Sequence, residues 1–186
     1  MHFPNQNRLP LRGFSFVLAG LAAAASFLLA SPAGAESRKE TFSGLPVPRF
    51  VEFNQRNAAC RQGPSREHPA VYRIRRKGPP VLVIGETRDH WRRVRDLDGD
   101  ICWAHKSVLR APKHVYVTED TELRTRAIDD ATVRAVIGAG ALSRIEGRKR
   151  DWARISVGSM TGWVPISALW GLPETAADAA VRKPSP

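Results

Sequence analysis

The chain has 186 residues and carries 29 Lys and Arg against 18 Asp and Glu, a formal net charge of +11. A balance this basic favours anionic partners, namely wall polymers, acidic lipid head groups, nucleic acid or an acidic protein. About 150 residues follow the apolar N-terminal segment, enough for one medium or two small domains, so we expect no separate catalytic module beside two such domains.

The first 35 residues have the pattern of a secretory signal peptide. Arg8 and Arg12 precede the apolar run Phe14–Ala30. Ala33-Gly34-Ala35 then supplies the small residues that signal peptidase accepts. We therefore expect residues 1–35 to be removed and the protein to be periplasmic or secreted, which makes nucleic acid the least expected anionic partner. An uncleaved membrane anchor is the alternative, because the apolar run is just long enough to span a bilayer.

The residues that follow predict short strands separated by turns. Residues 36–43 are polar, so we expect a flexible leader, and Phe50 to Phe53 suit an extended entry strand. Gln62-Gly63-Pro64-Ser65 predicts a turn, because Gly allows unusual φ values and Pro fixes φ. Val71–Arg75 alternates apolar and basic residues, and Val81–Ile84 is rich in β-branched residues, so both are predicted strands.

A tight hairpin comes next in the chain. Trp91–Arg95 and Asp100–Ala104 are predicted strands joined at Asp98-Gly99, a strong hairpin signal. Ser107-Val108-Leu109 is too short for a regular α-helix, so a single 3₁₀ turn is expected. Five short strands with such turns predict a small barrel, which ends at the linker Ala111–Lys113.

The same pattern then recurs about 60 residues later. The repeated positions are Trp91 and Trp152, Trp103 and Trp163, Ser107 and Ser167, and Leu109 and Leu169. A sequence that repeats at a fixed period builds the same structural unit twice. We therefore predict an all-β fold with two small barrels in tandem, at residues 44–111 and 112–173, and a disordered tail at 174–186. A barrel of about 60 residues is only marginally stable alone, so packing of one on the other is expected.

Several motifs resemble those of bacterial SH3 domains, and in particular of exported tandem SH3-like proteins of alphaproteobacteria. Trp91 to Asp96 is similar to their Trp-Arg-Arg-Ile-Arg-Asp strand, and Arg61 to Pro64 to their Arg-x-Gly-Pro turn. Gly44 to Val51 resembles their start and Leu169-Trp170-Gly171 their terminal Leu-Trp-Gly. The resemblance covers about residues 44–173 and implies two five-stranded SH3-like barrels.

The two cysteines, Cys60 and Cys102, lie on the first and last core strands of the predicted first barrel. Cys102 stands where the family usually has a Gly before the Trp, whereas Gly162 keeps that pattern in the second repeat. In an SH3-like barrel these strands come close together, and an oxidising compartment would then allow a disulfide. Two buried thiols are one alternative. A catalytic thiol is the other, but it requires a positioned His or Asn, and no His spacing singles one out.

A basic surface with interleaved aromatic residues is predicted on the first barrel. The candidate ligand-binding residues are Arg61, Tyr72, Trp91, Arg93, Arg95 and Trp103. The arginines predict either a patch that meets carboxylates or phosphates or a solvated face paired with nearby Asp residues. The tryptophans predict either an aromatic platform or core packing, and the charged neighbours of Trp91 and Trp152 favour the core.

Nothing in the sequence has the spacing of a metal site, a Gly-rich phosphate loop or a nucleophile elbow. We therefore expect no cofactor, no metal and no catalytic activity. The resemblance implies a non-catalytic periplasmic or envelope binding module that recognises peptidoglycan peptide, another anionic envelope ligand or an envelope protein. The alternatives are an accessory or targeting part of a cell-wall hydrolase system, or a basic nucleic-acid-binding barrel. Membrane contact is expected only through an uncleaved signal.

Overall fold

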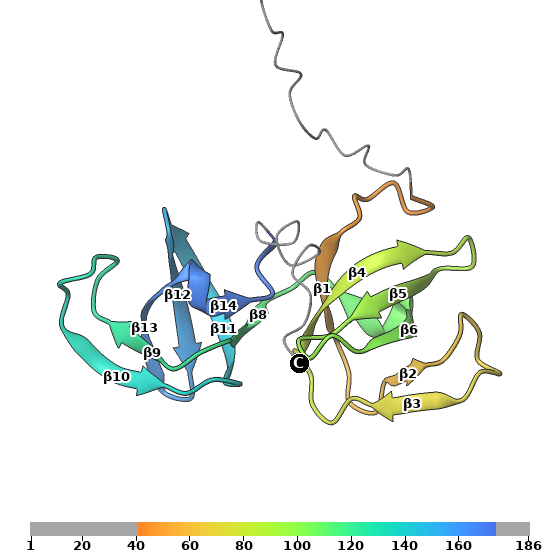
Figure 1. Cartoon of the computed structure of the whole chain (residues 1–186), viewed down its shortest axis with the longest axis horizontal. Helices are drawn as coiled ribbons and strands as arrows, with labels where there is room; N and C mark the ends of the chain where they lie inside the picture. Colours follow the sequence, from red (N-terminus) through yellow and green to blue (C-terminus); the bar gives the residue numbers. More distant parts are fainter. Residues whose placement is uncertain (1–40, 174–186) are drawn as a thin grey trace, which may run out of the picture. The chain divides into compact units, whose positions relative to one another are not determined.

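The computed structural model describes residues 41–173, in which two β-sheets follow each other along the chain (Figure 1). The predicted signal peptide, most of the predicted leader and the predicted tail lie outside these residues. The first barrel contains β1 (Arg49–Phe53), β2 (Ala59–Arg61), β3 (Ala70–Arg73), β4 (Pro80–Glu86), β5 (Trp91–Arg95), β6 (Ile101–His105), the 3₁₀ turn η1 (Lys106–Val108) and β7 (Leu109–Arg110). Its strand order is β3-β2-β6-β5-β4-β1-β7, with antiparallel pairing throughout.

The second barrel repeats this topology strand for strand. It contains β8 (His114–Val117), β9 (Thr121–Arg124), β10 (Val133–Ile137), β11 (Leu142–Lys149), β12 (Trp152–Val157), β13 (Met160–Pro165), the 3₁₀ turn η2 (Ile166–Ala168) and β14 (Leu169–Trp170). The order β10-β9-β13-β12-β11-β8-β14 matches the first sheet, with β8 in the place of β1. The prediction of an all-β chain with two SH3-like barrels is therefore confirmed. Each sheet has seven strands where the pattern indicated five, because Ala59–Arg61 and the two residues after η1 also pair.

Alternation along the strands separates the core from the surface of each barrel. The first core gathers Phe53, Cys60, Val81, Val83, Val94, Cys102 and Ala104, all at most 2% exposed. The second core gathers, among others, Val115, Val117, Leu123, Ala153, Ile155 and Val164. Because successive side chains point to opposite faces, the residues between these positions face outward. The strand β3 is the edge of its sheet, which explains why Val71 is 54% exposed although its sequence predicts a half-buried strand.

The predicted turns occur where the local signals placed them. Gly99 joins β5 to β6 with a φ of 93°, and Gly158 joins β12 to β13 with a φ of 57°. Both values lie in the left-handed region that glycine adopts at little cost. Each barrel also has a β-bulge. In β4 it lies between Val83 and Gly85, and in β11 it lies between Ile145 and Gly147. Among residues 41–173 there is no helix of the length and apolar character that crossing a membrane requires.

A buried carboxylate on β1 binds the segment that links the barrels. Glu52 is fully buried, and its Oε2 accepts hydrogen bonds from the backbone N–H groups of Lys113 (2.7 Å) and His114 (2.9 Å). The Nδ1 atom of His114 lies 2.9 Å from the same oxygen, and Arg110 Nε donates to Oε1 at 2.6 Å. Burial alone would raise the pKa of Glu52, but these donors hold it below its ordinary value of 4.5.

Apolar contacts accompany this polar junction. Phe50 and Leu82 of the first barrel form a small cluster with Ile84 and with Trp170 of the second barrel. The Phe50 and Trp170 rings meet edge to face, with centroids 4.8 Å apart. Gly171 follows with a φ of 116°, and a Cβ there would lie 2.9 Å from Pro80. The terminal Leu-Trp-Gly motif therefore places its Trp against the first barrel, where only glycine can follow.

We predict that Glu52→Gln lowers the free energy of unfolding by about 3 kcal/mol, because an amide nitrogen cannot accept from the converging donors. Since the pKa of Glu52 is lower in the folded chain, its contribution is complete above about pH 4.5 and is lost as the pH falls through the folded-state pKa. Urea unfolding between pH 3 and pH 7 measures this effect, with the exposed Glu119→Gln as control. Equal pH dependence in wild type and Glu52→Gln would contradict the assignment.

Candidate functional site

The hairpin of β5 and β6 positions most of the predicted site residues on one face of the first barrel. Arg93 lies opposite Trp103, and Trp91 lies opposite His105, with ring centroids 5.4 Å apart. Their neighbours Val94, Cys102 and Ala104 point into the core, so this set points outward. Trp103 also lies opposite Arg61 on β2. The outward row thus crosses three strands.

A pocket of about 270 Å³ opens beside this face. One wall comes from the segment around β2 and β3, with Gln55, Asn57, Ala58, Ala59, Arg61, Arg66 and Arg73. The other wall comes from β5, β6 and η1, with Trp91, His105, Ser107 and Val108. Trp91 is only 7% exposed and is one of the buried hydrophobic residues of the core, as the core interpretation predicts. It also lines the pocket.

Three guanidinium groups give this pocket a positive charge. Arg61 Nη1 donates to the carbonyl of His68 at 2.6 Å, and Arg73 Nη1 donates to the carbonyl of Asn57 at 3.1 Å. Arg66 makes no hydrogen bond or ion pair with any residue between 41 and 173. None of the three forms a salt bridge within that part of the chain. Glu67 interacts electrostatically with Arg61, whereas Arg66 and Arg73 offer the pocket guanidinium donors of the kind that bind carboxylates in a bidentate manner.

His105 adds a neutral polar group. Its Nδ1 accepts a hydrogen bond from the Ser107 backbone N–H at 3.3 Å and lies 2.8 Å from the Ser107 hydroxyl. An accepting nitrogen carries no proton, which requires the neutral ring. Burial and the positive charge of Arg66 lower the pKa of His105, which favours the same state. The positive charge of the pocket therefore comes from its arginines.

The Arg-x-Gly-Pro turn shapes the loop that carries Arg66. A Cβ on Gly63 would lie 2.3 Å from the His68 ring, so only glycine allows this ring to pack there. The Ser65 hydroxyl lies 2.8 Å from Nδ1 of His68, and the backbone of Gln62 donates to the carbonyl of Pro69 at 3.1 Å. The turn is thus a closed loop that holds Arg66 at the pocket rim.

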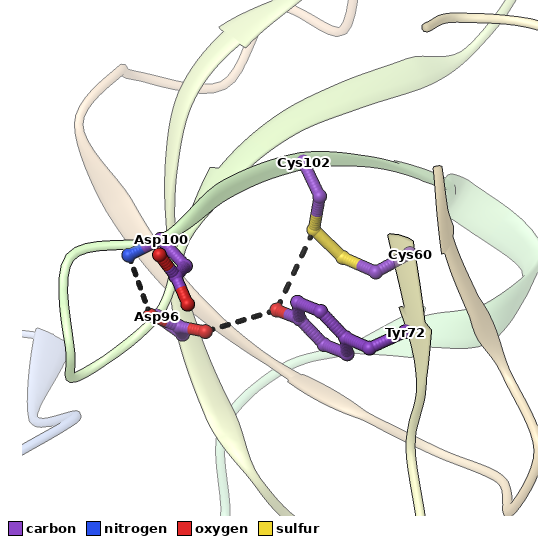
Figure 2. The surroundings of a disulfide bond; sticks show 5 residues. All are labelled: Cys60, Tyr72, Asp96, Asp100 and Cys102. Carbon is purple, nitrogen blue, oxygen red and sulfur yellow. Dashed lines mark hydrogen bonds between the residues drawn. A yellow bond between two sulfur atoms is a disulfide. The ribbon is translucent and has the colours of Figure 1, made fainter. Parts of the chain in front are cut away.

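Cys60 and Cys102 form a disulfide with a Cα–Cα distance of 5.4 Å (Figure 2). The Tyr72 ring points toward it, and its hydroxyl donates to Asp96 Oδ2 at 3.0 Å. The Cys102 sulfur lies 3.6 Å from the same hydroxyl oxygen; because a bonded sulfur has no hydrogen to donate, this is a packing contact. Burial raises the pKa of Tyr72 and of Asp96, so both groups favour their neutral forms more than free side chains do.

The disulfide joins the two walls of the pocket. Cys60 belongs to β2, and β2 meets β6 at a single register position, Arg61 opposite Trp103. In the second barrel the corresponding pair is Leu123 and Gly162, where a Cβ on the glycine would lie 2.6 Å from Leu123. Leucine against glycine therefore fills the space that the disulfide occupies in the first barrel. This explains the departure from glycine at Cys102.

The six predicted site residues divide into two groups. Arg61 and Trp91 line the pocket, and Arg93, Trp103 and Arg95 continue from it along the outward face. Tyr72 instead lies opposite Cys60 and contacts the disulfide, away from that face. Whether the first group binds a ligand stays a prediction.

Sequence reasoning missed Arg66 and His105 as pocket residues. The turn signal one residue before Arg66 could have drawn attention to it. No sequence motif pointed to His105, because its position in the pocket depends on how the strands pair. Within residues 41–173 no group of three or more His, Cys, Asp or Glu side chains is arranged to hold a metal ion.

Two barrels of this topology, each with a terminal 3₁₀ turn, define the class of small SH3-like β-barrel proteins. A model of the bacterial SH3 domain family matches residues 54–111 and 118–171, one segment in each barrel. The chain belongs to this family.

Solved structures to which the chain is similar include NlpC2 and NlpC1 from Trichomonas vaginalis, each 14% identical to this chain. The likeness covers 66% of this chain and 48% and 45% of theirs, with TM-scores of 0.31 and 0.30. The chain thus matches about half the length of these proteins. No curated protein matches it.

We predict that reducing the disulfide lowers the free energy of unfolding by about 4 kcal/mol, because it closes a loop with a sequence separation of 42 residues. Amide hydrogen exchange should rise in the segment from Gln55 to Arg73 and stay unchanged in β4 and β5. The control is the double variant Cys60→Leu with Cys102→Gly, which copies the Leu123–Gly162 pair and should be insensitive to a dithiol. A uniform rise in exchange across the barrel would contradict the view that the disulfide holds this segment in particular.

Proposed function

We propose that the protein is a non-catalytic binding module of the bacterial cell envelope, exported by its N-terminal signal peptide. Membership of the bacterial SH3 domain family supports the role as a binding module. The basic charge of the chain supports an anionic ligand. We further propose residues 44–111 and 112–173 as the limits of its two barrels.

The pocket of the first barrel is the proposed ligand site. The observation that carries this proposal is the meeting of Arg61, Arg66 and Arg73 around Trp91, with none of the three in a salt bridge. This statement covers residues 41–173. Guanidinium groups bind carboxylates through paired hydrogen bonds, and the indole offers an apolar surface to the adjoining part of the ligand.

The best-fitting ligand is therefore a short peptide that carries free carboxylates, as peptidoglycan peptides or the tail of an envelope protein do. The residue range 49–111 has 14 Lys and Arg against 7 Asp and Glu, whereas 112–173 has 9 against 7. The stronger positive charge of the first barrel supports placing the site there, because charge of one sign raises the local concentration of an oppositely charged ligand.

Arg66→Ala should lower the affinity for purified sacculi about tenfold, because a hydrogen bond to a charged partner contributes about 1.5–3 kcal/mol. Retention is measured by pull-down over a salt series, and the slope against salt should become shallower. The matched control is Arg76→Ala, which removes the same charge from an exposed position outside the pocket. A soluble peptide with free carboxylates should compete, and its amidated form should not.

Equal loss in Arg66→Ala and Arg76→Ala, or no retention of the wild type at low salt, would contradict the proposed site. A clearing band in a zymogram on sacculi would contradict the non-catalytic role and favour a hydrolase system. The mass of protein purified from the envelope tests export, because cleavage should leave Glu36 at the N-terminus.

A further inference from the structure

The two barrels carry the same four residues in the same cross-strand row. In the first barrel the row is Gly85 on β4, Arg93 on β5, Trp103 on β6 and Arg61 on β2. In the second barrel it is Gly147 on β11, Arg154 on β12, Trp163 on β13 and Arg124 on β9. We call each set the Gly-Arg-Trp-Arg row. Each position has the same degree of burial in both copies, with the middle Arg exposed and the other three partly buried.

Three of the four residues beside the row differ between the barrels. On one side Trp91 is matched by Trp152, but His105 is replaced by Pro165. On the other side Arg95 and Ile101 are replaced by Ser156 and Thr161. At all four positions of the row, by contrast, the two barrels have the same residue type.

One arginine of each row has a structural role. Arg61 donates to the carbonyl of His68 at 2.6 Å, and Arg124 donates to the carbonyl of Ala131 at 2.9 Å. Each carbonyl lies seven residues after its arginine. The loop after β2 and the loop after β9 are thus closed in the same way. Arg124 also forms an ion pair with Glu122.

The other arginine, Arg93 or Arg154, has no such role. Neither forms a hydrogen bond or an ion pair within residues 41–173. Each lies between a partly exposed indole and a glycine. The core does not require the indoles, because Cys102 and Ala104, or Gly162 and Val164, face inward on either side of them.

The glycines leave this surface open. Gly85 and Gly147 lack a positive φ, and a Cβ on Gly147 would meet nothing within 4 Å. A Cβ on Gly85 would meet only the Arg93 Cβ, at 3.6 Å. Packing does not require a glycine at either position. A strand glycine often marks a β-bulge, as both do here, or a place that a ligand approaches closely.

We infer that each row binds one unit of an acidic glycan, so that the chain holds a single glycan polymer at two equivalent sites. The flat C–H face of a sugar ring packs on the indole, and a carboxylate on the sugar pairs with Arg93 or Arg154. Two equal sites in one chain suit a ligand that repeats its own unit. This inference rests on the envelope location proposed above. Arg61 belongs to both the row and the pocket, but the residues assigned here to the glycan, Arg93 and Trp103, do not line the pocket.

The test is calorimetric titration of the purified full chain with a trimer of galacturonic acid, a carboxylated sugar. Two equivalent sites per chain are expected, and Trp163→Ala or Trp103→Ala should leave one. The polymer of the same sugar should bind the wild type about a hundredfold more tightly than either variant, because a second linked contact raises avidity by about 10²–10⁴.

Arg154→Ala and Arg126→Ala form the matched pair for the second barrel. Both remove one positive charge from an exposed position, but Arg126 lies outside the row. Arg154→Ala should remove one site for the trimer, and Arg126→Ala should leave both. Thermal unfolding of each variant confirms that the barrels remain folded. Unchanged stoichiometry in Arg154→Ala, or equal effects of the two substitutions, would overturn the inference.

Two further probes define the ligand class. A neutral glucose trimer should not bind, because the carboxylate contact is missing. A single-stranded oligonucleotide that bound the rows more tightly than the acidic glycan would overturn the assignment to glycans. Arg66→Ala separates this inference from the proposed pocket, since it should leave both trimer sites intact while it weakens binding of the carboxylated peptide.

Discussion

The covalent link between Cys60 and Cys102 is the constraint on which the pocket of the first barrel depends. Every residue of one pocket wall belongs to β2, β3 or the loops at their ends, and every residue of the other wall belongs to β5, β6 or η1. Strand pairing joins these two parts only where Arg61 lies opposite Trp103. Hydrogen bonds from Asn54 to Val108 and Ser107 join the walls at one end, and the disulfide joins them beside Arg61. The Tyr72 and Asp96 pair packs against the disulfide on the core side.

The second barrel makes the same contact by apolar packing alone. Leu123 fills the space that Gly162 leaves, and Ala135 and Val157 stand where the first barrel has Tyr72 and Asp96. Both solutions hold the edge hairpin against the sheet. Because the disulfide holds the hairpin covalently, the hairpin needs to bury less apolar area of its own. The first barrel can therefore carry an arginine-rich loop at that position.

Local signals in the sequence predicted the parts of the fold that local physics determines. Asp98-Gly99 and Gly158-Ser159 indicated the hairpins, and alternation placed Arg93 and Arg95 on one face. The structure does not bring Tyr72 to that face, because its side depends on the register that sets it opposite Cys60. The pocket was incomplete for the same reason, since Arg66 and His105 meet only through long-range pairing. Glu52 gave no signal either, because its partners at Lys113 and His114 lie 61 and 62 residues away.

The two barrels differ in the pocket residues but share the residues of the Gly-Arg-Trp-Arg row. The pocket and the row can therefore select different ligands. At the positions of Ala59, Arg73 and His105 the second barrel has Glu122, Val136 and Pro165. Glu122 neutralises Arg124, so the second copy has lost the unpaired charge that marks the pocket. A ligand that needs the pocket therefore has one place on the chain. The row has kept an exposed arginine in both copies, although neither Arg93 nor Arg154 forms a hydrogen bond or an ion pair among residues 41–173. Three of the four residues beside the row change between the two copies, so a shared ligand is the simpler explanation of the retained arginine.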